Sequence, residues 1–249
     1  MTYVEPTFRS AFQKDITMIV RAVPGGLELI TQPDHAHVAR TIMEHCVPLA
    51  NNPRRDAILH AVGEHDNGWA EEDAAPTINP DTGEVFDFVS APLAIRHAVW
   101  PRAVARLRDN PWAAALVAQH AMTVYDRFRS DAAWSAFYVQ MEQMRDNLVR
   151  ASKLPDNRLA ADYAFVRLGD LISLTFCTGW VEEQRFGDWR IQRVANRIVV
   201  TPDAFGGARI PFRVAARQLH VERFATNAML RQALSEATTS MLTGEVVST

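Results

Sequence analysis

The sequence has few cysteines, since Cys46 and Cys177 are the only two among 249 residues. Both lie in apolar periodic segments, which favours two buried thiols over a disulfide and fits a reducing compartment. The chain also lacks an excess of basic residues: its formal net charge is −3, which argues against a nucleic-acid partner. No apolar run approaches the roughly 18 residues that a bilayer span requires, and the first residues lack the features of a signal peptide. We therefore expect a cytoplasmic protein with no membrane partner.

Several motifs of common enzymes are missing as well. The sequence contains no P-loop, and no GxGxxG motif follows a predicted strand, so the usual phosphate cradles of nucleotide-binding folds are absent. Ser173 and Thr175 have no arrangement of bases near them, which argues against a nucleophilic triad. The sequence therefore has to be interpreted from its histidines and carboxylates.

The distribution of hydrophobic residues predicts one domain of the α+β class, mainly α. Residues 1–17 carry little pattern and are interpreted as an N-terminal arm, and residues 18–249 as a single domain. Two β-rich runs around Pro24-Gly25-Gly26 predict a β-hairpin over residues 18–32. Helical periodicity dominates residues 33–182. Residues 183–249 predict a small C-terminal antiparallel sheet, followed by a helix from Phe224 to Leu242. The two β-rich parts could also join into one antiparallel sheet.

The stretch from Ala57 to Trp69, AILHAVGEHDNGW, organises the helical part. Ile58, Val62, His65, Asp66 and Trp69 fall on one face of a helix with a period of 3.6 residues. Gly68 is predicted to end this helix through a left-handed turn. A buried imidazole and carboxylate need partners, so this doublet predicts either a hydrogen-bond network or a metal site.

Three further helices carry an ionisable residue on the stripe that should face the core, namely His35, His120 and Asp170. A lone buried histidine or aspartate is more often structural than functional. Four segments that each present such a group favour a shared site, because imidazole and carboxylate together suit a divalent transition metal such as Fe, Mn, Zn or Ni.

Local motifs carry a resemblance to known families. The segments QPDHA (Gln32 to Ala36), HDNGW (His65 to Trp69), QHA (Gln119 to Ala121) and GDLISLTFC (Gly169 to Cys177) resemble a bacterial group, the domain-of-unknown-function family 3891, over roughly Met18 to His220. More distantly, the order H…HD…D resembles the HD-domain superfamily of metal-dependent phosphohydrolases. The HD resemblance implies an HD-like helical core over residues 33–182.

The HD resemblance also implies a chemistry, in which a metal-bound water attacks a phosphate ester. It implies that the metal ligands are His35, His65, Asp66 and Asp170. Asp66 and His120 are then the expected catalytic residues, with His120 as a second-metal ligand or a phosphate contact. Arg102 or Arg167 could neutralise the phosphate. The loop over residues 70–90 would wall the pocket, and the expected substrate-binding residues near the doublet are Asn67, Trp69 and Glu71.

The sequence thus predicts a metal-dependent hydrolase of a phosphorylated small molecule, and two alternatives stay open. Some HD-like proteins with two irons perform oxidative cleavage with dioxygen and resemble H…HD…H…H…D, a pattern that His97 and His120 could complete. A non-catalytic HD-like module that binds a ligand or partner would close the polar cluster with hydrogen bonds and have no pocket beside the doublet. The C-terminal strands could form the edge of a homodimer.

Overall fold

The computed structural model describes residues 18–249, and the predicted arm over residues 1–17 lies outside the described residues. Strands β1 (Ile19–Val23) and β2 (Gly26–Ile30) pair as an antiparallel hairpin. Gly26 has a φ of +153°, and a Cβ at this position would lie 1.8 Å from the carbonyl oxygen of Leu219. Only glycine therefore allows the hairpin to approach its neighbouring strand this closely.

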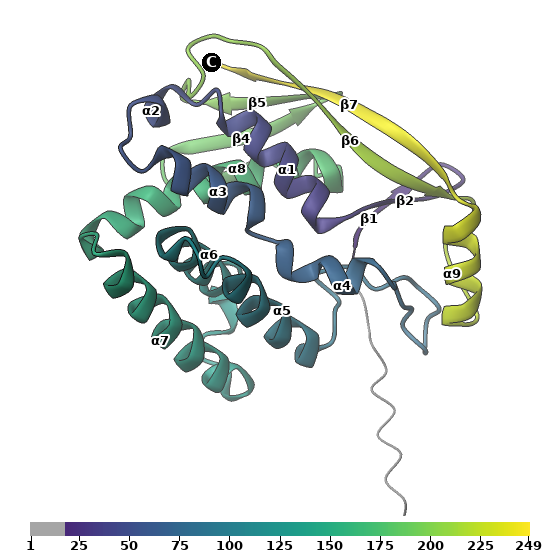
Figure 1. Cartoon of the computed structure of the whole chain (residues 1–249). Helices are drawn as coiled ribbons and strands as arrows, with labels where there is room; N and C mark the ends of the chain where they lie inside the picture. The colour runs from purple at the N-terminus through teal and green to yellow at the C-terminus, as the bar shows by residue number, and fades with distance from the viewer. Residues whose placement is uncertain (1–17) are drawn as a thin grey trace, which may run out of the picture.

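Helices make up most of the chain between the hairpin and the later strands (Figure 1). In order they are α1 (Gln32–Met43), α2 (Val47–Ala50), α3 (Arg55–Glu64), α4 (Ala70–Asp73), α5 (Leu93–Arg106), α6 (Pro111–Val124), α7 (Ser135–Ser152) and α8 (Leu159–Thr178), with short 3-10 turns η1 (Asn67–Trp69), η2 (Asp126–Phe128), η3 (Ala132–Trp134) and η4 (Asp156–Arg158). Thr31 is the N-cap of α1, and its side chain accepts a hydrogen bond from the backbone N–H of Asp34. The side chain of Asn110 caps α6 in the same way.

The remaining strands join the hairpin in one sheet. They are β3 (Gln184–Phe186), β4 (Trp189–Val194), β5 (Arg197–Thr201), β6 (Ile210–Leu219) and β7 (Thr238–Ser248), with helix α9 (Asn227–Glu236) between the last two. Within residues 18–249 these form a seven-stranded sheet in the order β1-β2-β6-β7-β5-β4-β3. All neighbours are antiparallel except β5 and β7, which are parallel, so the sheet is mixed.

The predicted fold, an HD-like helical core with a separate N-terminal β-hairpin and a small C-terminal antiparallel sheet, is therefore wrong. The helix expected from Phe224 to Leu242 ends at Glu236, and a strand of 11 residues follows it. Met241 and Leu242 continue the apolar spacing of α9, which concealed the start of β7. Parallel pairing of β5 with β7 links residues 48 positions apart, such as Arg197 and Glu245, and local patterns cannot reveal such a contact.

The helices are layered on the sheet instead of forming a core of their own. Figure 1 shows α1 and α8 lying along one face of the sheet, with α5, α6 and α7 farther from it. The α8 helix crosses α1 and α3 closely at Gly169, where a Cβ would lie 2.8 Å from Cγ of Met43 and 3.1 Å from Cγ1 of Val62. The small residue at this crossing lets the next residue, Asp170, enter the space between the helices.

Gly68 has a different role from the one predicted. It does not adopt a left-handed conformation but lies in the 3-10 turn η1, where a Cβ would come within 2.1 Å of the backbone oxygen of Val99. The glycine thus allows α5 to pack against the segment that follows His65 and Asp66. Among residues 18–249, no helix combines the length and apolar character needed to cross a membrane.

Candidate metal centre

Four helices bring the five predicted ligand residues together in the interior. His35 lies on α1, His65 is the C-cap residue directly after α3, Asp66 follows it, His120 lies on α6 and Asp170 on α8. All five are buried, and His35 and His65 have no exposed surface. Because α3 ends at Glu64 and Asp66 departs from helical geometry, with φ −111° and ψ 16°, the two adjacent side chains of the doublet can both reach the same space.

His65 occupies the middle of this cluster. Its ring centroid lies 4.9 Å from that of His35 and 4.9 Å from that of His120. Its Nε2 atom lies 3.6 Å from Oδ2 of Asp66 and 3.4 Å from Oδ1 of Asp170, yet it is buried and forms no hydrogen bond within residues 18–249. A buried nitrogen that lies between two carboxylates and forms a hydrogen bond with neither calls for an explanation.

The Nδ1 nitrogens of His35, His65 and His120 all have hydrogen-bond partners. Nδ1 of His65 donates to the carbonyl oxygen of Val62 at 2.7 Å. Nδ1 of His35 lies 3.0 Å from Oγ of Ser173, which itself donates to the carbonyl oxygen of Asp170. The Ser173 oxygen can therefore accept the Nδ1 proton of His35. The Nε2 atom of His35 lies 2.7 Å from Oδ2 of Asp66, and a metal ion would take the Nε2 lone pair in place of that hydrogen bond. This is the pattern by which outer hydrogen bonds orient histidines that bind metals.

His120 follows the same pattern, since its Nδ1 lies 3.1 Å from the hydroxyl of Tyr163 and its Nε2 lies 3.9 Å from Oδ2 of Asp170. Burial lowers the pKa of His120 to about 3, despite the nearby carboxylates, so its imidazole is neutral near pH 7. A neutral imidazole is the form that binds a metal ion.

The two carboxylates keep their charge although they are buried. Burial alone would raise the pKa of Asp66, but the neighbouring His65 and His35 lower it below its usual value. The pKa of Asp170 is also lowered, because His65 and the guanidinium of Arg167 outweigh the effect of burial. For His65, burial would lower the pKa, but Asp66 and Asp170 raise it to about 9. The metal-free cluster thus holds a proton on His65 between two anionic carboxylates.

This donor set fits a divalent transition metal. His35, His65 and Asp66 form one group of three, and His65, His120 and Asp170 form another, each with one donor atom per residue within 4.8 Å of the others. Two donors about 2.0–2.2 Å from the same ion lie up to about 4.4 Å apart, so small side-chain adjustments suffice for ligation. Nitrogen and carboxylate oxygen ligands suit Zn, Fe, Mn or Ni. A metal would replace the proton that His65 otherwise holds.

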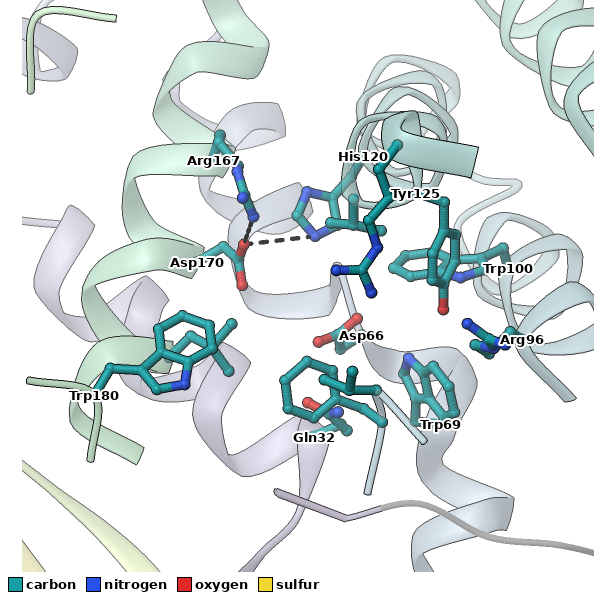
Figure 2. A pocket seen from close by; sticks show the side chains of 15 residues that line it. Gln32, Asp66, Trp69, Arg96, Trp100, His120, Tyr125, Arg167, Asp170 and Trp180 are labelled. Atoms are coloured by element: carbon teal, nitrogen blue, oxygen red, sulfur yellow. Dashed lines mark hydrogen bonds and ion pairs between the residues drawn. The ribbon is translucent and has the colours of Figure 1, made fainter. Parts of the chain in front are cut away.

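A cavity of about 240 Å³ opens beside the cluster and is lined by Asp66, His120 and Asp170 (Figure 2). Its other walls combine aromatic rings with guanidinium groups, and its lining also includes Trp69, Trp100, Tyr125, Trp180, Arg96, Arg127 and Arg167. Phe88 and Val89, from the loop over residues 70–90, line it too. The cluster is therefore accessible to a small molecule on one side.

The predicted substrate contacts lie in different places. Trp69 lines the cavity, whereas Asn67 and Glu71 lie outside its lining. Asn67 is buried and donates to Glu64, and Glu71 pairs with Arg102 and Arg106. Arg102 binds Glu71 and Glu72 and the carbonyl oxygen of Gly68, so its charge is already matched away from the cavity.

His97 does not join the other histidines. Its ring packs among aromatic side chains, with its centroid 4.7 Å from that of Trp134 and 5.1 Å from that of Phe137. Arg167 does reach the site, where its NH1 atom donates to Oδ2 of Asp170. Of the two arginines that the sequence suggested for phosphate binding, only Arg167 lines the cavity.

Sequence reasoning missed several residues of the site. The expectation that Ser173 has no base near it is wrong, because Nδ1 of His35 lies 3.0 Å from its hydroxyl oxygen. The roles of Ser173 and Tyr163 in orienting two histidines were not predicted, although both residues lie on the buried side of α8. Arg96 and Arg127 were missed because arginines at single positions look like ordinary surface charges. Their contribution depends on the way α5 and the turn after α6 meet around the cavity.

Comparisons with known proteins identify a family. A family model described as "Protein of unknown function (DUF3891)" matches residues 18–221. No curated protein and no solved structure matches the chain. The comparisons thus give no activity and no support for the HD-domain resemblance.

Proposed function

We propose that this chain, which belongs to the DUF3891 family, is a metal-dependent hydrolase of a phosphorylated small molecule. The observation that carries the proposal is the buried Nε2 atom of His65, which has no hydrogen-bond partner within residues 18–249 and lies 3.4 and 3.6 Å from two carboxylate oxygens. The proposal depends on this cluster and on the cavity beside it, not on the HD-domain resemblance.

The proposed ligands are His35, His65, Asp66, His120 and Asp170. Asp66 and Asp170 supply two negative charges, which match the charge of one divalent ion. Ser173, Val62 and Tyr163 hold the three imidazoles through their Nδ1 atoms, so the Nε2 atoms stay directed at the centre. A bound divalent ion would lower the pKa of a water ligand to about 7 and neutralise charge on phosphoryl oxygens.

The cavity gives the substrate a defined place. Three members of the cluster, Asp66, His120 and Asp170, also line the cavity (Figure 2). A substrate in the cavity would therefore contact the candidate metal centre directly. Arg167, which donates to Asp170, lies at the same wall and can neutralise a phosphate oxygen there. Trp69, Trp100 and Trp180 provide apolar surface that excludes water around the reacting group. A non-catalytic module would need no cavity beside the doublet.

Elemental analysis tests the proposal. The protein is purified without chelator or histidine tag, alongside His65→Ala and Asp170→Asn and with the exposed His37→Ala as a matched histidine control. We expect about one or two transition-metal ions per chain in the wild type and in His37→Ala, and loss of the metal in the other two variants. The metal-loaded wild type should then release phosphate from small phosphomonoesters, and EDTA should stop the reaction.

Two results would overturn the proposal. The first is an absence of bound metal in the wild type even after reconstitution with Mn, Fe, Zn and Ni. The second is a metal-loaded protein that consumes dioxygen with an organic substrate but releases no phosphate, since this would assign the cluster to oxidative chemistry.

A further inference from the structure

We infer that the cavity recognises a small substrate with two anionic groups, one at the metal centre and a second at Arg96 and Arg127. The inference rests on the proposed function for the nature of the first group, a phosphate held beside Arg167. The second group is a carboxylate or a phosphate, since a guanidinium binds either anion through paired N–H donors.

Arg96 is the first observation. It lies on α5 at the cavity wall, near Trp69 and Tyr125 in Figure 2. Its Nε atom is buried and has no hydrogen-bond partner, and within residues 18–249 the side chain forms no ion pair. A guanidinium carries five N–H donors and is costly to bury without a counter-ion. The side chain therefore has unused donors next to an open space.

Aromatic rings hold this guanidinium in place without using its donors. Its central carbon lies 5.3 Å from the ring centroid of Trp134, 5.6 Å from that of Phe128 and 6.0 Å from that of Tyr125. Such contacts stabilise the cation through the faces of the rings. Hydrogen bonds from a guanidinium lie in its own plane, so a ligand can still receive them. The packing positions the guanidinium of Arg96 at the cavity wall, but it provides no anion.

Arg127 provides a second cation at the same cavity. It lies in the turn η2, and its guanidinium carbon is 4.7 Å from the ring centroid of Phe128, one of the rings that also contacts Arg96. Arg127 is exposed to solvent and lines the cavity, which places it where the cavity meets the surface. It too forms no hydrogen bond or ion pair with another residue of the described chain, whereas many surface arginines of this chain do.

The charge of the cavity lining points to a ligand of more than one anionic group. The lining contains Asp66 and Asp170 against Arg96, Arg127 and Arg167. A divalent ion would neutralise both aspartates, and the three arginines would then face the ligand uncompensated. One phosphate monoester can be held at the centre by the ion and Arg167. Arg96 and Arg127 remain available for a further anion.

The size of the cavity limits the ligand to a small molecule. Its volume of about 240 Å³ lies below the range of about 300–1,000 Å³ that is usual for sites of drug-sized ligands. Burial raises the pKa of Tyr125 well above its usual value, so this residue stays protonated and adds a neutral hydroxyl beside Arg96. A short carbon chain with an anion at each end fits these dimensions better than a nucleotide or a polymer.

The experiment uses ligands that differ only in the charge of the second group. They are ω-carboxyalkylphosphonates with two to four methylene groups and their isosteric terminal amides, whose C–P bonds resist hydrolysis. Affinities are measured by titration calorimetry on the full chain, metal-free and zinc-loaded. Bisphosphonates of the same lengths form a further arm that distinguishes a phosphate from a carboxylate as the second group. We expect at least one acid or bisphosphonate to bind tenfold or more tightly than the matching amide.

Three variants locate the preference. Arg96→Gln and Arg127→Gln should each reduce it at least threefold while leaving amide binding within twofold of the wild type. Arg129→Gln is the control, because Arg129 also lies over a ring, that of Tyr138 at 4.8 Å, but outside the cavity lining. If Arg96→Gln proves unstable, Arg127→Gln still decides, since this residue is exposed.

The inference is overturned if no acid or bisphosphonate is preferred more than twofold over its amide, or if the preference persists in both cavity variants. Each preference is the ratio of the affinity for the acid or bisphosphonate to the affinity for the amide, and it is measured separately for the metal-free and the zinc-loaded protein. A protein that binds no metal would therefore fail the proposed hydrolase function and could still retain the anion preference, so the two failures are distinguishable.

Discussion

Ser173 offers a sharp test of how the candidate metal centre is organised. In the structure its hydroxyl donates to the carbonyl oxygen of Asp170 and lies 3.0 Å from Nδ1 of His35, whose ring has no exposed surface. We predict that Ser173→Ala lowers metal affinity about 10- to 100-fold without removing any ligand, which is the usual effect of losing an outer hydrogen bond of a metal-binding histidine.

The magnitude follows from the fate of His35. Without the serine oxygen, its Nδ1 proton has no acceptor in a fully buried position, which costs about 1–3 kcal/mol. The ring can escape this cost by moving its proton to Nε2, where Oδ2 of Asp66 lies 2.7 Å away. That tautomer removes the lone pair that would bind the metal. The variant should therefore fold, because the metal-free protein avoids the unpaired Nδ1 proton by changing the tautomer of His35. It should lose metal affinity, because metal binding at Nε2 forces the proton back to Nδ1, where it has no acceptor.

The assay is competition for zinc against a chromophoric chelator, with thermal unfolding of both proteins as a check on folding. Thr175→Val is the matched control: Thr175 lies on the same helix, is also fully buried, and donates only to the backbone oxygen of Leu171. The reasoning is refuted if Ser173→Ala binds zinc within twofold of the wild type, or if Thr175→Val loses as much affinity.

Three further predictions concern stability. Asp162 is buried and accepts hydrogen bonds from Arg54, Asn52 and Trp112. Asp162→Ala should therefore leave the half-buried guanidinium of Arg54 unpaired and lower the free energy of unfolding by about 3–5 kcal/mol in urea denaturation; a loss below 1 kcal/mol would contradict this. Gly68→Ala should lower the free energy of unfolding by about 1–3 kcal/mol in the same assay, since the added Cβ would meet the backbone oxygen of Val99. An unchanged free energy of unfolding would contradict this and show that α5 can move away. The metal-free protein should become less stable as pH rises from about 6.5 to 9. The pKa of His65 is raised to about 9 in the folded protein, against about 6.5 in the unfolded chain, so protonated His65 stabilises the fold fully below pH 6.5 and this contribution is lost as His65 loses its proton. A denaturation midpoint that rises over this pH interval would refute the prediction.

The sequence was most informative where a pattern is local. The spacing along Ala57 to Trp69 indicated that His65 and Asp66 face inward at a helix end, and both are buried there. The stripes that contain His35, His120 and Asp170 could be recognised for the same reason, because helical periodicity repeats within a few residues. Whether these residues bind a metal stays a prediction.

Features that depend on distant segments could not be predicted. The order of the sheet requires β7 to pair with β5 and β6, and nothing within Thr238–Ser248 specifies these partners. Gly68 looked like a helix terminator because its neighbour in space, Val99, is 31 positions away along the chain. The cationic end of the cavity depends in the same way on α5 and η2 coming together around aromatic rings.

The central position of β7 has a consequence for how this family is delimited. The family match ends at residue 221, whereas β7 spans Thr238–Ser248 and is the strand that joins β1-β2-β6 to β5-β4-β3. A chain cut at the family boundary would keep every residue of the candidate metal centre and yet expose two unpaired strand edges inside its own sheet. Such edges invite aggregation. They would also make the truncated chain an acceptor for a separate peptide of the β7 sequence, so this protein is suited to being split into two fragments that reassemble.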